Sequence, residues 1–265
     1  MQIPLVSGIY TDTSPELRVS YPINLLVTPS PSSGVGDYYL RPGEGIKKFA
    51  DTSGLDRGAY NWQGSHYRVI GTQLVLIDAL GNINVLGDVG GNSTQFVKFA
   101  NSFERLAIVS DGSLYYYDGS TFVKVTDPDL GYIIDVAFNG GYFVLTDGEN
   151  IIVTDLTDPT SINPLKYGSS EADPDPVVGI LNLRNEICAI NRFTIELFDN
   201  VGGDFFPFQV IDGAQIQKGA IGNSAFCLFD EKIAFVGSGK GESTGIYLGV
   251  NASTEMISTG TPAAF

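Results

Sequence analysis

The feature that most constrains the fold is a grouping of four short strand-like runs that recurs along the chain from about residue 58. The runs are rich in Val, Ile, Tyr and Phe, which are favoured in strands. The second runs of successive groups begin near residues 66, 105, 142, 186 and 232. A four-stranded unit of about 40 residues is typical of a β-propeller blade. We therefore predict an all-β, β-propeller-like fold with about five recognisable four-stranded antiparallel blades, the last opening at Ser224–Phe229.

Turn residues between the runs support hairpins within each group. Asn-Gly or Asp-Gly pairs occur at Asp111-Gly112, Asp118-Gly119, Asn139-Gly140 and Asp147-Gly148. A type I′ turn needs positive φ at both central residues, which such pairs tolerate. We therefore expect tight antiparallel hairpins at these four places. A β-sandwich would also contain short strands, but it would not predict the fourfold grouping.

Residues 1–57 have a different composition. They contain six prolines and the small-residue run 32–36, with one strand-like piece at Pro22–Val27. We predict an extended N-terminal arm over 1–57 and a propeller over 58–265. The arm either crosses a neighbouring subunit or is a loosely packed terminus. It could also supply a strand that closes the propeller; alternatively, this chain stops before the propeller is complete.

Strong acidity narrows the classes of partner. Fifteen Lys and Arg stand against thirty Asp and Glu, which gives a formal net charge of −15. Binding to DNA phosphates needs clustered cations, and docking on an anionic membrane does too. Both classes are therefore excluded, whereas DNA that passes close by without binding is not. The first residues show no secretory signal and the apolar runs are too short to span a bilayer, so synthesis in the cytoplasm is expected.

The sequence contains little from which a catalytic site could be built. Its one histidine, His66, has no Gly-x-Ser-x-Gly elbow to accompany it, and residues 237–241 lack the spacing of a phosphate loop. Cys188 and Cys227 lie in apolar runs, so we expect small buried side chains, and a single disulfide remains open. We predict that the protein is not an enzyme and needs no cofactor or metal.

Carboxylates concentrate in one stretch of the chain, residues 111–175. Twelve Asp and Glu there face only two Lys. Asp127 with Asp129, and Asp173 with Asp175, flank single prolines. Three interpretations are open: the paired carboxylates of a glycoside hydrolase, oxygen ligands for calcium, or a solvated acidic face in connecting loops. Neither the hydrolase nor the calcium interpretation has a diagnostic spacing.

Several short stretches, taken in order, resemble one protein family. They are Tyr21–Leu26, Tyr39–Gly43, Arg57–Gly58, Tyr67–Val69, Thr194–Phe198, Ile216–Gly219 and Phe235–Gly239. These stretches are similar to the packaged-DNA stabilization proteins, also called tail accessory factors or tail hubs, of short-tailed bacteriophages. The resemblance runs in register over most of the chain, and the order and spacing of the motifs carry it. Family members continue beyond the position of Phe265.

The resemblance implies a structural virion protein of the phage tail, made in the host cytoplasm. It implies a homo-oligomer, a six-fold ring that seals the portal vertex, stabilises packaged DNA and forms part of the DNA exit channel. The partners implied are the portal adaptor, the tail needle and the tailspikes, with DNA nearby but not bound by sequence. Like-charged channel walls would keep the genome from sticking. The expected channel-facing acidic loops carry Asp127, Asp129, Asp173 and Asp175.

A second set of residues is expected in the arm. Tyr21, Asn24, Leu25 and Arg41 are the predicted subunit-contact residues. The alternative function is a carbohydrate-binding or glycoside-hydrolysing propeller. That function requires two carboxylates and an aromatic platform that converge on one end of the propeller.

Overall fold

The computed structural model describes residues 25–29, 38–91, 94–171 and 173–258. The chain divides into two compact units, residues 1–49 and 50–265. In the first unit, β1 (Leu25–Pro29) pairs antiparallel with β2 (Tyr38–Pro42). The second unit contains the remaining strands, and no helix occurs in the described ranges of either unit. The assignment of residues 1–57 to an extended arm stays a prediction.

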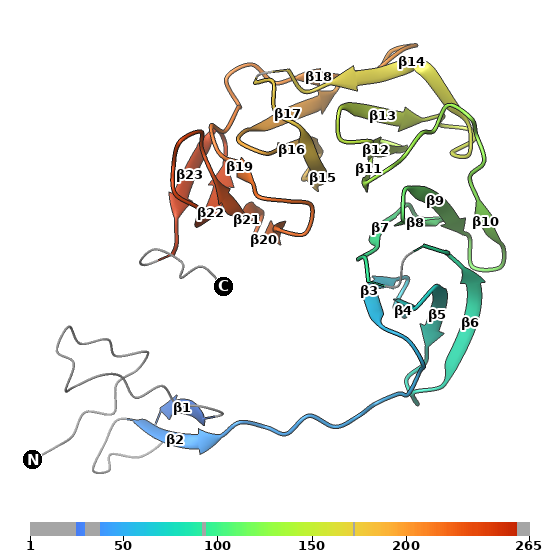
Figure 1. Ribbon diagram of the computed structural model, residues 1–265, viewed down its shortest axis with the longest axis vertical. Helices are drawn as coiled ribbons and strands as arrows, with labels where there is room; N and C mark the ends of the chain where they lie inside the picture. Colours follow the sequence, from blue (N-terminus) through green and yellow to red (C-terminus); the bar gives the residue numbers. More distant parts are fainter. Residues whose placement is uncertain (1–24, 30–37, 92–93, 172, 259–265) are drawn as a thin grey trace, which may run out of the picture. The chain divides into compact units, whose positions relative to one another are not determined.

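Five antiparallel sheets follow one another along the second unit (Figure 1), which confirms the all-β fold and the five predicted blades. Blade 1 contains β3 (Asp56–Trp62), β4 (Ser65–Ile70), β5 (Gln73–Ile77) and β6 (Ile83–Asp88). Blade 2 contains β7 (Lys98–Asn101), β8 (Leu106–Ser110), β9 (Ser113–Tyr117) and β10 (Phe122–Lys124). Blade 3 contains β11 (Asp135–Asn139), β12 (Tyr142–Thr146), β13 (Asn150–Thr154) and β14 (Ile162–Ser169).

The last two blades continue this order. Blade 4 contains β15 (Val177–Leu183), β16 (Glu186–Asn191), β17 (Ile195–Asn200) and β18 (Phe208–Val210). Blade 5 contains β19 (Gly219–Ala220), β20 (Phe226–Phe229), β21 (Lys232–Ser238), β22 (Gly245–Val250) and β23 (Ser253–Met256). Strand β11 contacts both β7 and β15, and β15 contacts β20, so the opening strands of blades 2–5 form a continuous inner edge.

Neighbouring blades are held together by four apolar cores, one between each successive pair. In β12 (Tyr142–Thr146), apolar and polar side chains do not alternate along the strand. Phe143 and Leu145 point into the core shared with blade 2, whereas Tyr142 and Val144 point into the core shared with blade 4. A strand covered on both faces reads as a continuous apolar run, because neither face meets water.

Blade 5 differs from the prediction in how it begins. The expected first strand is present as β20, but a short strand, β19, also pairs with β21 further along the same edge. The segment between them, residues 221–225, leaves the sheet. Two residues are too short a run for a periodic signal, so β19 has no signature in the sequence.

Antiparallel hairpins occur at all four predicted places, and the predicted residue pair forms the turn itself at one of them. Asp111 and Gly112 both have positive φ, +46° and +76°, as a type I′ turn requires. At the predicted Asn139-Gly140 place the turn lies one residue later, at Gly140 and Gly141. Asp118 and Asp147 instead accept backbone N–H bonds within longer connections, which is the usual role of Asp in Asx-turns.

The two cysteines have different environments. Cys188 is fully buried in β16, and burial raises the pKa of its thiol to about 12. Cys227 is exposed on β20, so the expectation that both are buried is wrong for this residue. Both thiols are free.

We expect Gly237→Ala to destabilise blade 5 by about 3 kcal/mol, because the site has no room for a methyl group. A Cβ at Gly237 would lie 1.7 Å from the carbonyl oxygen of Gly219 on β19. Urea unfolding monitored by tryptophan fluorescence and far-ultraviolet circular dichroism measures the change. Gly222→Ala is the matched control, since nothing lies within 4 Å of a Cβ there. Equal stabilities of the two variants would contradict the prediction.

Candidate functional site

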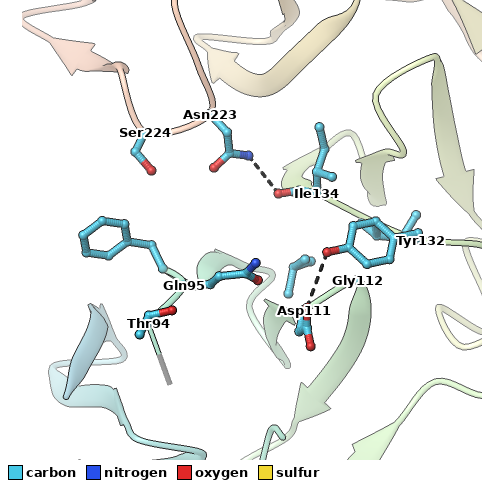
Figure 2. Close-up of a pocket in the computed structure, with 11 residues that line it drawn as sticks. Thr94, Gln95, Asp111, Gly112, Tyr132, Ile134, Asn223 and Ser224 are labelled. Carbon is cyan, nitrogen blue, oxygen red and sulfur yellow. Dashed lines mark hydrogen bonds between the residues drawn. The ribbon is translucent and has the colours of Figure 1, made fainter. Parts of the chain in front are cut away.

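A cavity of about 360 Å³ lies in the second unit where the chain enters the inner strands of blades 2 and 3 (Figure 2). Its walls come from four separate segments, residues 94–96, 109–112, 132–134 and 223–224. Two of these segments lead into β7 and β11, one contains the β8–β9 turn, and one belongs to the 221–225 segment of blade 5. The cavity therefore exists only where three blades meet.

The first wall is fixed by the buried Arg57 of β3. Its Nε donates to the carbonyl oxygen of Gln95 at 2.6 Å, and the carbonyl oxygen of Arg57 accepts the N–H of Val97 at 2.9 Å. These two bonds hold residues 95–97 against blade 1. They set the position of Gln95 and of Phe96, whose side chain is 68% exposed.

The second wall is the Asp111-Gly112 turn with Tyr132 packed on it. A Cβ at Gly112 would lie 2.1 Å from the Tyr132 ring, so only glycine allows the ring to rest there. The N–H of Ile133 donates to the carbonyl oxygen of Gly112 at 3.1 Å. The Tyr132 hydroxyl lies 3.5 Å from a carboxylate oxygen of Asp111, as Figure 2 shows.

The third wall is contributed by blade 5. The Asn223 side-chain amide donates to the carbonyl oxygen of Ile134 at 2.9 Å (Figure 2). Lys98 of β7 donates to the carbonyl oxygen of Asn223, and its ammonium lies 5.2 Å from the centre of the Phe226 ring. These contacts tie blade 5 to blades 2 and 3, so the cavity is preformed.

A buried carboxylate lies beside this junction. Asp135, at the start of β11, accepts the N–H of Ile180 of blade 4 at 3.0 Å and the N–H of Val136 at 2.9 Å. Burial raises the pKa of Asp135 to about 6, and the nearby Lys98 ammonium opposes the rise. The inner edge therefore contains one carboxyl group that titrates near neutral pH.

The lining of the cavity combines one charged group with aromatic surface. Among the described residues that line it, Asp111 is the only one with a charged side chain. Phe96 and Tyr132, 68% and 57% exposed, provide aromatic surface. A glycosidase needs a second carboxylate opposite the first, and the lining residues include none. The geometry thus offers one carboxylate, two rings and several amide and hydroxyl groups.

The structure separates the two pairs of acidic residues predicted for the channel. Asp127 is half-buried and accepts the N–H of Asp129 at 2.9 Å and the N–H of Ile162, the first residue of β14, at 3.0 Å. Asp129 is exposed. This pair therefore lies between the outer strands of blades 2 and 3.

The second pair lies beside turns of blades 4 and 5. Asp175 is half-buried, and its carboxylate accepts the N–H of Phe193 and the hydroxyl of Thr194. Asp173 forms an ion pair with Lys240, which follows β21. Among the four, Asp129 alone is exposed.

Two of the four residues predicted for the subunit-contact arm are described. Leu25 lies opposite Pro42 in the hairpin of the first unit and is 38% exposed. Arg41 lies opposite Leu26 and forms an ion pair with Glu44 at 3.3 Å. Tyr21 and Asn24 lie outside the described residues.

Among the described residues, no group of three or more His, Cys, Asp or Glu side chains is placed to hold a metal ion. Over the same residues, no helix is both long and apolar enough to cross a membrane.

Taken together, the repeated blades and their inner edge define a β-propeller protein whose blade junction carries a small binding cavity. The chain belongs to the family described as "Bacteriophage P22 Gp10, beta-propeller", whose model matches residues 1–261. It is 28% identical to the tail hub protein gp10 of Salmonella phage P22 over 282 aligned positions. That alignment covers 97% of this chain and 57% of the phage P22 protein.

Similarity to solved structures supports the fold alone. PorZ, a surface component of the type-IX secretion system of Porphyromonas gingivalis, has a TM-score of 0.51 and 14% identity, over 77% of this chain and 28% of that one. The extracellular domain of a one-component system from B. thetaiotaomicron has a TM-score of 0.53 and 9% identity, over 78% of this chain and 28% of that one.

Proposed function

We propose that this chain acts as a tail hub protein in the virion of a short-tailed phage. The match of the family model along residues 1–261 is the observation that carries the proposal. In this role the chain would assemble into a six-fold ring, seal the portal vertex, stabilise packaged DNA and form part of the exit channel. The portal adaptor, the tail needle and the tailspikes would be its neighbours. Its role would be structural rather than catalytic.

The architecture supports this role in two ways. Both faces of blade 3 are packed in apolar cores, which gives a rigid scaffold for contacts with other proteins. The net charge of −15 disfavours DNA that adheres to the protein while the genome passes. Light scattering of the purified chain, alone and mixed with portal–adaptor complexes, tests the assembly. Persistent monomers that do not bind those complexes would contradict it.

We also propose that the loops with Asp127, Asp129, Asp173 and Asp175 face the DNA passage in the ring. Asparagine at all four positions removes four charges and keeps one acceptor oxygen on each side chain, so only one of the two main-chain N–H bonds that Asp127 accepts is lost. We expect this variant to bind duplex DNA several-fold more tightly at low salt, because it lacks four charges that repel the phosphates. The difference should shrink in physiological salt, where counterions screen charges at about 10 Å and beyond. Fluorescence anisotropy of a labelled duplex measures the affinity.

A matched variant separates position from net charge. Asparagine at four exposed carboxylates in other connections removes the same charge: Asp118, Asp158, Asp204 and Asp230. A smaller rise in DNA affinity for this control is the expected result. Equal rises in the two variants would show that only net charge matters, and the channel role of the four predicted residues would then be wrong.

A further inference from the structure

The cavity at the blade junction has the composition of a site for a cation. Among the described lining residues the single charge is the carboxylate of Asp111, and no Lys, Arg or His accompanies it. The carboxylate is exposed, and the Tyr132 hydroxyl at 3.5 Å is a distant partner for it. A cationic donor would therefore form a shorter, charge-assisted bond with Asp111 than the present one.

Arg57, a cation of the protein itself, does not act as the hydrogen-bond partner of Asp111. Arg57 is close enough to interact electrostatically with Asp111. Its guanidinium is committed elsewhere, with bonds to the carbonyl oxygens of Gln95, Gly71 and Gly90 and to the Ser110 hydroxyl. Arg57 is also buried and cannot swing into the cavity without breaking all four bonds. Asp111 is thus left available to a ligand.

Aromatic rings and amides complete the environment of a long cationic side chain. Phe96 and Tyr132 expose most of their surface and can cover an alkyl stem or face its charged end. Figure 2 shows Gln95 between the Asp111 side of the cavity and the side formed by Asn223 and Ser224. Amide and hydroxyl oxygens accept the further N–H groups of an ammonium or guanidinium.

We propose that this cavity binds a Lys or Arg side chain presented by a partner polypeptide. A volume of about 360 Å³ is at the lower end of the range for ligand pockets and suits one long side chain. The net charge of −15 steers a basic segment toward the protein. A saccharide is disfavoured as the occupant, since its neutral hydroxyl groups would leave the charge of the Asp111 carboxylate uncompensated. The inference is independent of the tail-hub role, because it rests on the cavity alone.

The test uses N-acetyl-Ala-Lys-Ala-amide as the probe and its norleucine analogue as the uncharged match. Titration is followed by the backbone amide resonances of Gly112 and Ser224 at low ionic strength. We expect saturable shifts with the lysine peptide, and with the peptide that has arginine in place of lysine. We expect none with the norleucine peptide. Asp111→Asn, which keeps the left-handed turn because Asn tolerates it, is expected to weaken binding about tenfold or more. Asp118→Asn removes the same charge from another connection and is expected to bind as the wild type does.

Three results would overturn the proposal. They are equal shifts with the lysine and norleucine peptides, undiminished binding by Asp111→Asn, or shifts of these amides by a monosaccharide panel that the lysine peptide does not produce. Phe96→Ser gives a second route if Asp111→Asn does not fold. Phe96 is largely exposed, so its loss is expected to weaken peptide binding and to leave the fold intact.

Discussion

Arg57→Met is expected to lower the free energy of unfolding by about 4 kcal/mol, the largest effect of any single substitution considered for this protein. Arg57 is 1% exposed and donates to the carbonyl oxygens of Gly71, Gly90 and Gln95 at 3.0, 2.9 and 2.6 Å. Methionine fills much of the same volume but donates no hydrogen bond, so these three carbonyl oxygens and the Ser110 hydroxyl each lose a donor. Urea unfolding at neutral pH measures the loss.

The matched control is Arg68→Met on the neighbouring strand β4. Arg68 pairs with Asp56, and both side chains are partly exposed, so water can replace the pair. Its loss is expected to cost less than about 1 kcal/mol. If the two variants lost equal stability, the hydrogen bonds of Arg57 would not be what joins blade 1 to blade 2.

Asp135→Asn is expected to change the pH dependence of stability. Burial raises the pKa of the Asp135 carboxyl in the folded protein to about 6, above its ordinary value of 3.8. The folded state therefore binds this proton more tightly than the unfolded state. The resulting stabilisation is complete below about pH 4 and is lost as the pH rises through 6. Wild type should gain about 2 kcal/mol relative to Asp135→Asn between pH 7 and pH 4.

The groups that face Asp135 set the interpretation of that experiment. They are the Lys98 ammonium and the N–H groups of Ile180 and Val136, and all three favour the charged form. Asp118→Asn provides a control of opposite sign, because hydrogen bonds from Thr121 and Ser120 lower the pKa of Asp118. Relative to that variant, wild type should lose stability on acidification. A pH-independent difference between wild type and Asp135→Asn would contradict the buried-carboxylate account.

The blades could be predicted from the sequence because each is a local unit. Four runs joined by short connections leave a period of about 40 residues. Strands such as β12 and β16 have continuous apolar centres because both of their faces are covered. The turn chemistry was less predictable. Only Asp111 and Gly112 form the expected turn, and at Asp118 and Asp147 the backbone N–H bonds that these carboxylates accept favour longer connections.

The cavity could not be predicted, since its walls come from four segments with no shared motif. Asp111 and Gly112 were visible as a turn, but nothing in the sequence places Tyr132 on that turn or brings Asn223 to Ile134. The channel-facing role of the four acidic residues is predicted from local charge density. Density does not report which carboxylates are committed to main-chain N–H groups, as Asp127 and Asp175 are.

The bond from Lys98 to the carbonyl oxygen of Asn223 spans 125 positions of the chain. A contact of such sequence separation is costly to close in an open chain, and it becomes affordable once blades 3 and 4 hold its ends near each other. Synthesis delivers the N-terminal blades first, so this contact forms among the last. The cavity that it completes is therefore absent from nascent chains, and a partner that recognises the cavity binds only subunits whose five blades have all been assembled.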